Sequence, residues 1–331
     1  MAVKSVRESR LEWIDWMKAI GIYLIVLGHF YSVGEKLIYV FHVPLFFMIS
    51  GFLNKKEAEG QVFWKKIWYN LAVPILIMAT LNLIIHSILK LLNGSFEPID
   101  LYWFVRNVLF GMVSGYDALW FVYTLIILKI LFQYCLSLRL FYSVTAVMLA
   151  LAYFYNNFDL SCFPFFLSQP NAVVNICTAF PFFALGIFLR DFKVVLNEWN
   201  QTMMLLSTFV CGMLVVIGCC YFNEYVAMYR CDYGSSIILF LLGGIVGSIM
   251  IFALSKILGR EIKVVVIISR GTIILLGFHK LLIALIREFF SESYLDIFFA
   301  AMIVMLFVPL IITTEKYFPL MVGKYRVKKN L

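Results

Sequence analysis

Charged residues are scarce in this sequence. They make up 14% of the 331 residues, whereas soluble domains carry about 25%. Hydrophobic residues make up 63% of the chain, and 18% of it is aromatic. This low fraction of charged residues and high fraction of hydrophobic residues exclude a soluble enzyme, an intrinsically disordered chain and a small disulfide scaffold. The composition is that of a polytopic membrane protein.

Several other signals are missing. The seven cysteines show no Cys-x-x-Cys spacing, and no two histidines are three or four positions apart, so we predict neither a redox pair nor a metal site. We find no internal repeat, inverted or parallel, which disfavours a secondary transporter. Long hydrophilic loops are also lacking. We therefore expect no extramembrane domain, and any chemistry must take place inside the helix bundle or at its rims.

Long apolar runs dominate the sequence instead. A helix needs roughly 20 apolar residues to cross the hydrocarbon core. With this window the sequence predicts an all-α, polytopic membrane protein, a single transmembrane domain over residues 1–331. Ten spans are predicted, at 13–33, 37–53, 71–92, 119–137, 140–155, 173–189, 202–222, 235–257, 268–288 and 295–314. The stretch 101–113, which holds Arg106 within an aromatic run, is expected to lie at the membrane interface as an amphipathic helix.

The distribution of positive charge predicts the orientation, because cytoplasmic loops carry an excess of Lys and Arg. With the N-terminus inside, twenty of the 27 Lys and Arg residues fall on the cytoplasmic side and five on the outer side, when residues near the ends of spans are counted to the adjoining side; Lys129 and Lys280 lie deeper within spans. This bias predicts both termini in the cytoplasm, with tails at 1–12 and 315–331. The net charge of +8 is then a consequence of topology and does not indicate a nucleic-acid partner.

Ionisable side chains within the first predicted span are functional candidates, since such groups are costly in a membrane. They are Asp15, Lys18 and His29. On an α-helix the three share one stripe, and Lys18 and His29 are about 16 Å apart along the axis. In the predicted topology Lys18 lies near the cytoplasmic surface and His29 in the outer half. The alternatives are that Lys18 snorkels to lipid phosphates and that His29 only makes an interhelical hydrogen bond.

All four histidines fall on the outer side of this topology. His42 lies in the second span beside Pro44, which is expected to kink the helix, and His279 lies in the ninth span. Imidazole is the side chain best suited to proton transfer near neutral pH. The sequence thus predicts a catalytic group of His29, His42 and His279, and His86 is the one expected to be a mere interface residue.

These residues resemble the motifs of the acyltransferase-3 family of bacterial integral membrane O-acyltransferases, and within it the fucose 4-O-acetylase-like subgroup. Lys18 and His29 are similar to its signature of a basic residue, ten intervening positions and a histidine. Other stretches that resemble the family are 13–21, 42–52, 119–121, 182–186 and 271–279. Where many members carry Arg-x-x-Arg before the third span, this chain has Lys65 and Lys66, which offer point charges without the bidentate fork of arginine.

The resemblance implies an enzyme that transfers an acyl group, usually acetyl from cytoplasmic acetyl-CoA, to a hydroxyl. The acceptor would be a surface polysaccharide or a lipid-linked glycan, and the location the bacterial inner membrane, among membrane lipids. Lys18, Lys65 and Lys66 are expected to attract the phosphates of CoA, with Asp15 in the same binding region. The acetyl-CoA is a co-substrate, and no metal is expected. A homo-oligomer is compatible with the sequence.

Within this scheme His29 would act as general base on the sugar hydroxyl or as a transient acyl carrier, two roles that the sequence does not separate. His42 and His279 would bind the sugar or stabilise the developing oxyanion. The expected substrate contacts are Trp120, Ser50 and Thr272. The main alternative is a carrier or exporter of glycan or acyl intermediates whose histidines relay protons, and a third reading is a membrane scaffold without chemistry.

Overall fold

The computed structural model describes residues 10–32, 34–112, 118–160 and 162–323, and within these ranges all regular elements are helices. The all-α prediction is therefore confirmed. The α-helices are α1 (Glu12–Gly28), α2 (Glu35–Leu53), α3 (Gly60–Ile67), α4 (Val73–Leu92), α5 (Pro98–Phe110), α6 (Trp120–Tyr134), α7 (Leu138–Asn157), α8 (Phe165–Ser168), α9 (Ile176–Arg190), α10 (Lys193–Glu198), α11 (Thr202–Phe222), α12 (Ile237–Leu258), α13 (Lys263–Arg270), α14 (Thr272–Arg287) and α15 (Asp296–Tyr317). A π-helical turn η1 (Trp68–Ala72) joins α3 to α4, and the 3-10 turns are η2 (Met228–Arg230) and η3 (Pro319–Val322).

The protein is a multi-pass membrane protein. Within the described residues, six helices are long and apolar enough to cross a membrane, or seven if the bent pair α13 and α14 forms one span. Each of the ten predicted spans coincides with an apolar helix, but α1, α6 and α9 have only 17, 15 and 15 residues. A helix of 15 residues is about 23 Å long, which is shorter than the hydrocarbon core. The number ten therefore stays a prediction.

Other sequence predictions fall partly outside the described residues. Tails are predicted at 1–12 and 315–331, and of these, residues 1–9 and 324–331 are outside the described ranges. The interfacial stretch predicted at 101–113 corresponds to α5, in which only Phe104 is buried. Residue 113, the last of the predicted stretch, is outside the described ranges.

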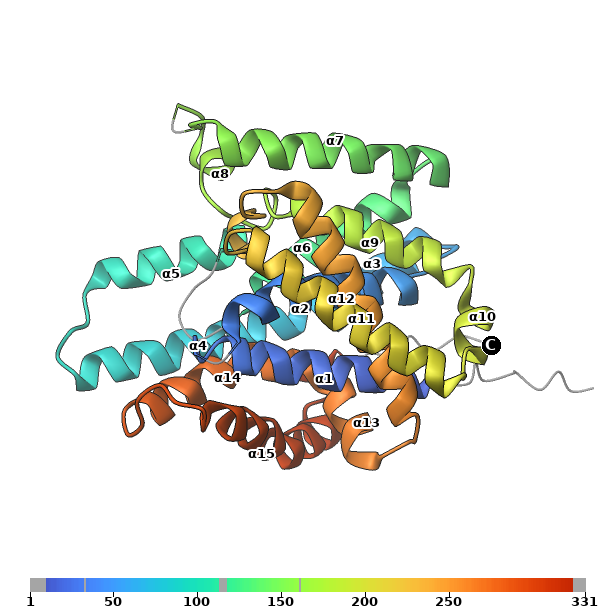
Figure 1. Ribbon diagram of the computed structural model, residues 1–331. Coiled ribbons are helices and arrows are strands. Elements are labelled where there is room, and N and C mark those ends of the chain that lie inside the picture. The colour runs from blue at the N-terminus through green and yellow to red at the C-terminus, as the bar shows by residue number, and fades with distance from the viewer. Residues whose placement is uncertain (1–9, 33, 113–117, 161, 324–331) are drawn as a thin grey trace, which may run out of the picture.

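The centre of the bundle is built around α2, which packs against α1, α9, α11 and α12. Figure 1 shows these helices between α7 on one side and α15 on the other. Two glycines allow the closest approach. A Cβ atom on Gly51 of α2 would collide with the backbone carbonyl oxygen of Phe183 in α9, and one on Gly186 of α9 would collide with that of Met48. The backbones of α2 and α9 are thus in direct contact, as small residues permit in membrane helix pairs.

The two ends of the bundle differ. In Figure 1, α10 and α13 lie at one end, and α5 and the short α8 lie at the opposite end. The first turns of α1 belong to the end with α13, because Trp16 donates a hydrogen bond from Nε1 to the carbonyl of Arg260 at 2.9 Å. We call the end that contains α10, α13 and the start of α1 the basic end, since Lys193, Arg260 and Lys263 are found there.

Candidate active site

Three of the predicted site residues meet on different helices. His29 directly follows α1, His42 lies in α2 and His279 in α14. His279 Nε2 lies 3.3 Å from His29 Nδ1, and the centroids of the two rings are 4.8 Å apart. The fourth histidine, His86, is in α4 and is not among the described residues that line the cavities below. The structure thus brings together the group that the sequence predicted.

The hydrogen bonds of these rings define which nitrogen carries the proton. In each ring Nδ1 lies against the carbonyl oxygen of the residue four positions earlier, at 2.8 Å for His29, 2.8 Å for His42 and 2.6 Å for His279. A carbonyl oxygen can only accept, so each Nδ1 must be the protonated nitrogen. When the ring is neutral, Nε2 is therefore its basic nitrogen. The Nδ1–H of His29 also faces Nε2 of His279, which can accept from it.

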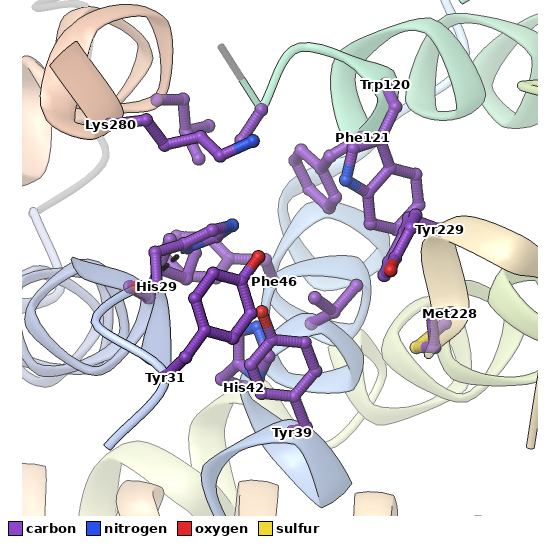
Figure 2. Close-up of a pocket in the computed structure, with 14 residues that line it drawn as sticks. His29, Tyr31, Tyr39, His42, Phe46, Trp120, Phe121, Met228, Tyr229 and Lys280 are labelled. Carbon is purple, nitrogen blue, oxygen red and sulfur yellow. Dashed lines mark hydrogen bonds between the residues drawn. The ribbon is translucent and has the colours of Figure 1, made fainter. Parts of the chain in front are cut away.

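His29 and His42 line a cavity of about 100 Å³, which we call the histidine cavity. Figure 2 shows their rings directed into it, with Trp120 and Tyr229 on the far wall and Lys280 reaching toward the same space. Trp120, predicted as a substrate contact, thus lines the histidine cavity. His279 is fully buried behind His29 and is not a lining residue. It can act on the reaction only through His29.

The chain segment after His29 is held by a buried ion pair. Arg287, at the end of α14, binds both carboxylate oxygens of Asp296 at 2.9 and 2.8 Å, and its guanidinium also donates to the carbonyl of Phe30 at 2.8 Å. Ser32 donates to the same carboxylate at 2.5 Å. Tyr31, which lies between Phe30 and Ser32, has a φ of 54°, a left-handed conformation that is strained for a residue with a side chain. The ion pair therefore fixes the turn that carries His29.

Replacing Arg287 by lysine is expected to lower kcat about tenfold, because lysine cannot bridge a carboxylate with two parallel hydrogen bonds and the His29 turn loses its clamp. The KM for the acyl donor that the resemblance implies should not change. Steady-state kinetics of Arg287→Lys beside Arg139→Lys, an exposed arginine in α7, would measure this. An unchanged kcat, or a change confined to KM, would contradict a positioning role for Arg287.

A second cavity, of about 240 Å³, lies deeper in the bundle and is called here the middle cavity. Lys18, Lys129, Ser50 and Thr272 line it. Lys129 donates to Asn54 Oδ1 at 2.7 Å, whereas Lys18 Nζ makes no hydrogen bond or ion pair with any described residue. Ser50 and Thr272, predicted as substrate contacts, are thus on the path between the two ends of the bundle and not beside the histidines.

A third cavity, of about 530 Å³, lies at the basic end and is called the basic cavity. Its positive residues are Arg10, Lys18, Lys193 and Arg270. Asp15 also lines it, but its carboxylate is bound by Arg10 at 2.5 and 2.9 Å and by Ser269 Oγ at 2.5 Å. Asp15 is thus in the predicted region, where it anchors the Arg10 side chain to the start of α1.

The structure places Lys65 and Lys66 outside the basic cavity. Both are exposed on α3, neither is among the residues lining the basic cavity, and Lys66 pairs with Glu57 at 2.6 Å. The basic residues that line this cavity together with Lys18 are Arg10, Lys193 and Arg270, which the sequence analysis did not single out. They lie at or near the predicted cytoplasmic ends of spans, as do many other basic residues, and only tertiary packing distinguishes them.

The three cavities follow one another through the protein. The basic and middle cavities share Lys18, Leu53, Leu71, Thr272 and Ile273 as lining residues. The middle and histidine cavities share Phe46, Phe121 and Leu276, which we call the apolar wall. The rings of Phe46 and Phe121 meet edge to face with centroids 6.0 Å apart. A row of hollows therefore leads from Lys18 to the apolar wall, with the histidines behind it.

Among the described residues, no group of three or more His, Cys, Asp or Glu side chains is arranged so that it could hold a metal ion. The site combines buried imidazoles with a row of cavities that leads to a cationic surface cavity.

The chain belongs to the acyltransferase-3 family, because the model of that family's acyltransferase domain matches residues 11–314. No curated protein and no solved structure shows a significant match to the sequence. The match covers nearly the whole chain and most of the residues that line the three cavities. The protein is therefore a membrane acyltransferase.

Proposed function

We propose that the protein is an O-acetyltransferase of the bacterial inner membrane that moves the acetyl group of cytoplasmic acetyl-CoA to a hydroxyl of a surface or lipid-linked polysaccharide. The observation that carries this proposal is the row of cavities that joins Lys18 to the histidines. In this proposal the ten apolar helices all cross the membrane, both termini are cytoplasmic, and the basic cavity faces the cytoplasm. The preference of Lys and Arg for cytoplasmic segments supports this orientation.

The donor would bind with its charged end in the basic cavity. Arg10, Lys18, Lys193 and Arg270 line it and would neutralise the phosphates of CoA. The uncharged pantetheine arm would extend through the middle cavity past Ser50 and Thr272. The rise from Lys18 to His29, about 16 Å along α1, is comparable with the reach of that arm. The thioester would then lie at the apolar wall, next to the histidines.

The chemistry follows from the protonation of the imidazoles. His29 Nε2 takes the proton of the acceptor hydroxyl while that oxygen attacks the thioester carbonyl carbon. The tetrahedral intermediate collapses, the carbon–sulfur bond breaks, and the proton passes from His29 to the departing thiolate of CoA. While His29 is positive, its Nδ1–H donates to His279 Nε2, which lies 3.3 Å away.

Four further residues complete this scheme. His42 Nε2 is a hydrogen-bond acceptor, because its Nδ1–H is donated to a backbone carbonyl. It would accept from a neighbouring hydroxyl of the sugar and so orient the acceptor, while Trp120 and Tyr229 offer aromatic faces to the sugar ring. Lys280 lines the same cavity and would stabilise the negative oxygen of the intermediate.

Replacing Lys18 by alanine is expected to raise the KM for acetyl-CoA about tenfold and to change kcat much less, because a charge that faces the donor and not the reacting carbon contributes to binding. Lys65→Ala, which removes an exposed lysine outside the basic cavity, should leave both constants unaltered. The measurement is release of free CoA thiol from acetyl-CoA by the purified protein, with and without a surface-glycan acceptor.

The same assay tests the proposed function. Thiol release that rises with the acceptor supports the transferase. A folded protein that binds glycan and releases no thiol under any condition would overturn it in favour of a carrier. Mass spectrometry of the protein after incubation with acetyl-CoA alone separates the two roles of His29, since a general base leaves the protein unmodified and an acyl carrier gains one acetyl group.

A further inference from the structure

A helix begins at the place where the basic and the middle cavity meet. The helices α13 and α14 are bent by 84° relative to each other, with Gly271 between them. Thr272 and Ile273, the first two residues of α14, line both cavities, and so does Lys18 of α1. We call the boundary that these three residues share the junction. The N-terminus of α14 therefore faces the junction.

This helix start offers hydrogen-bond donors to a ligand. The first N–H groups of a helix have no acceptor within the helix. Neither the N–H of Thr272 nor that of Ile273 donates to any residue that the structure describes, whereas the N–H of Ile274 donates to the carbonyl of Gly271 at 3.0 Å. The helix dipole adds partial positive charge at the same end. Both properties favour a phosphate group at the junction.

Two lysines bring full positive charges to the same place. Lys18 is enclosed by the bundle apart from the two cavities that it lines, and its ammonium group forms no hydrogen bond or ion pair with a described residue. Lys129 of α6 lines the middle cavity and donates to Asn54 Oδ1 at 2.7 Å. Asn54 directly follows Leu53, which also lines both cavities. The ammonium group of Lys129 therefore lies beside the junction.

Carboxylates do not neutralise these two charges. Among the described residues no Asp or Glu lines the middle cavity, and Asp15 in the basic cavity is already bound by Arg10. Glu57, whose charge also acts on Lys129, is paired with Lys66 at 2.6 Å. Positive charges inside a membrane protein are costly without a partner. The junction is thus built for an anionic ligand.

The position of the junction selects one of the anionic groups of the proposed donor. CoA carries a diphosphate, to which the pantetheine arm is joined directly, and a separate phosphate on its ribose. Lys18 and His29 are about 16 Å apart along α1, which is comparable with the reach of the pantetheine arm. With the thioester at the apolar wall, the group that reaches Lys18 is therefore the diphosphate.

We propose that the junction binds the diphosphate of the acyl donor and that Lys129 is a donor-binding residue. This inference rests on the proposed function. The N–H groups of Thr272 and Ile273 donate to the phosphate oxygens, and Lys18 and Lys129 neutralise their charge. The adenosine and the ribose phosphate remain in the basic cavity.

The first experiment measures binding without any reaction. Inorganic pyrophosphate is the probe, and isothermal titration calorimetry of the purified, detergent-solubilised protein gives its Kd. We expect Lys129→Met to weaken binding at least about tenfold, the effect of one lost hydrogen bond between charged groups. Lys129→Arg keeps the charge and should retain most of the affinity. Lys263→Met removes an exposed lysine that lines neither cavity and should bind pyrophosphate as the unchanged protein does.

The second experiment compares three donors in the thiol-release assay. They are acetyl-CoA, acetyl-dephospho-CoA, which lacks the ribose phosphate, and acetyl-pantetheine, which lacks the diphosphate as well. Lys129→Met should raise the KM for the first two by about tenfold and leave kcat unaltered. The KM for acetyl-pantetheine should not change, because this donor has no group that Lys129 binds.

The outcomes separate this inference from the proposed function. Pyrophosphate binding that Lys129→Met leaves unaltered would overturn the inference, as would an equal rise in KM for all three donors, since Lys129 would then act through the fold and not through the diphosphate. Either result, with thiol release intact, leaves the proposed function standing. A protein that binds pyrophosphate through Lys129 and releases no thiol from any donor would retain the anion site and overturn the proposed function.

Discussion

Replacing His29 by alanine lowers kcat for acyl transfer by about a thousandfold and leaves the KM for acetyl-CoA within about twofold of its original value. General base catalysis contributes about 10²–10⁴ in rate, and the alanine variant has no imidazole that could act as the base. The residues proposed to bind the donor line the basic and middle cavities, on the other side of the apolar wall, so the substitution should not disturb them. The measurement is the initial rate of thiol release at saturating acceptor.

Two further histidine variants sharpen this prediction. His86→Ala removes a histidine of α4 that lines none of the three cavities in the described part of the chain, and it should keep the full rate. His279→Gln should lower kcat about tenfold, because it acts only by orienting His29 and by accepting from its Nδ1–H. A His29→Ala protein that keeps more than a tenth of the rate would exclude His29 as the base.

The second large effect concerns folding. Gly186→Ala is expected to destabilise the protein by about 2–4 kcal/mol, since the added methyl group collides with a backbone carbonyl that no rotamer change can move. That carbonyl belongs to Met48, six positions after His42 on α2. Separating α2 from α9 would also displace His42 from the histidine cavity. We expect a lower thermal unfolding midpoint and a smaller monodisperse fraction in size-exclusion chromatography.

The chain offers a matched control for this prediction. Gly218 lies in α11, and a Cβ atom added there would meet nothing within 4 Å. Gly218→Ala should therefore leave the unfolding midpoint unchanged or raise it, because alanine is favoured over glycine within a helix by about 1 kcal/mol. Equal midpoints for the Gly186 and Gly218 variants would show that α2 and α9 are not in the close contact described.

Much of the fold could be predicted from the sequence because it depends on local patterns. The length of an apolar run and the ordering of basic residues are visible in any window, and all ten predicted spans coincide with helices. The stripe that joins Lys18 to His29 was predictable for the same reason, since it lies within one helix. His42 and His279 followed from the cost of ionisable groups in a membrane and from the resemblance to a family.

Contacts between distant elements could not be predicted in this way. Arg287 and Asp296 lie on opposite sides of a turn, and nothing in the sequence shows that they hold the segment after His29. Lys65 and Lys66 have the charge expected for a donor site, yet α3 presents them outside the basic cavity. Ser50 and Thr272 were assigned to the substrate, and only the arrangement of α2 and α14 around the middle cavity brings these two residues together.

The apolar wall of Phe46, Phe121 and Leu276 has a consequence for the energy supply of the cell. A row of water-sized spaces from the cytoplasm to the outer half of a membrane would conduct protons if it were continuous. Three buried, non-ionisable side chains interrupt it between Lys18 and the imidazoles. In the proposed orientation the closed wall would keep the resting protein from conducting protons, and an opening would need to last only as long as one acyl group passes.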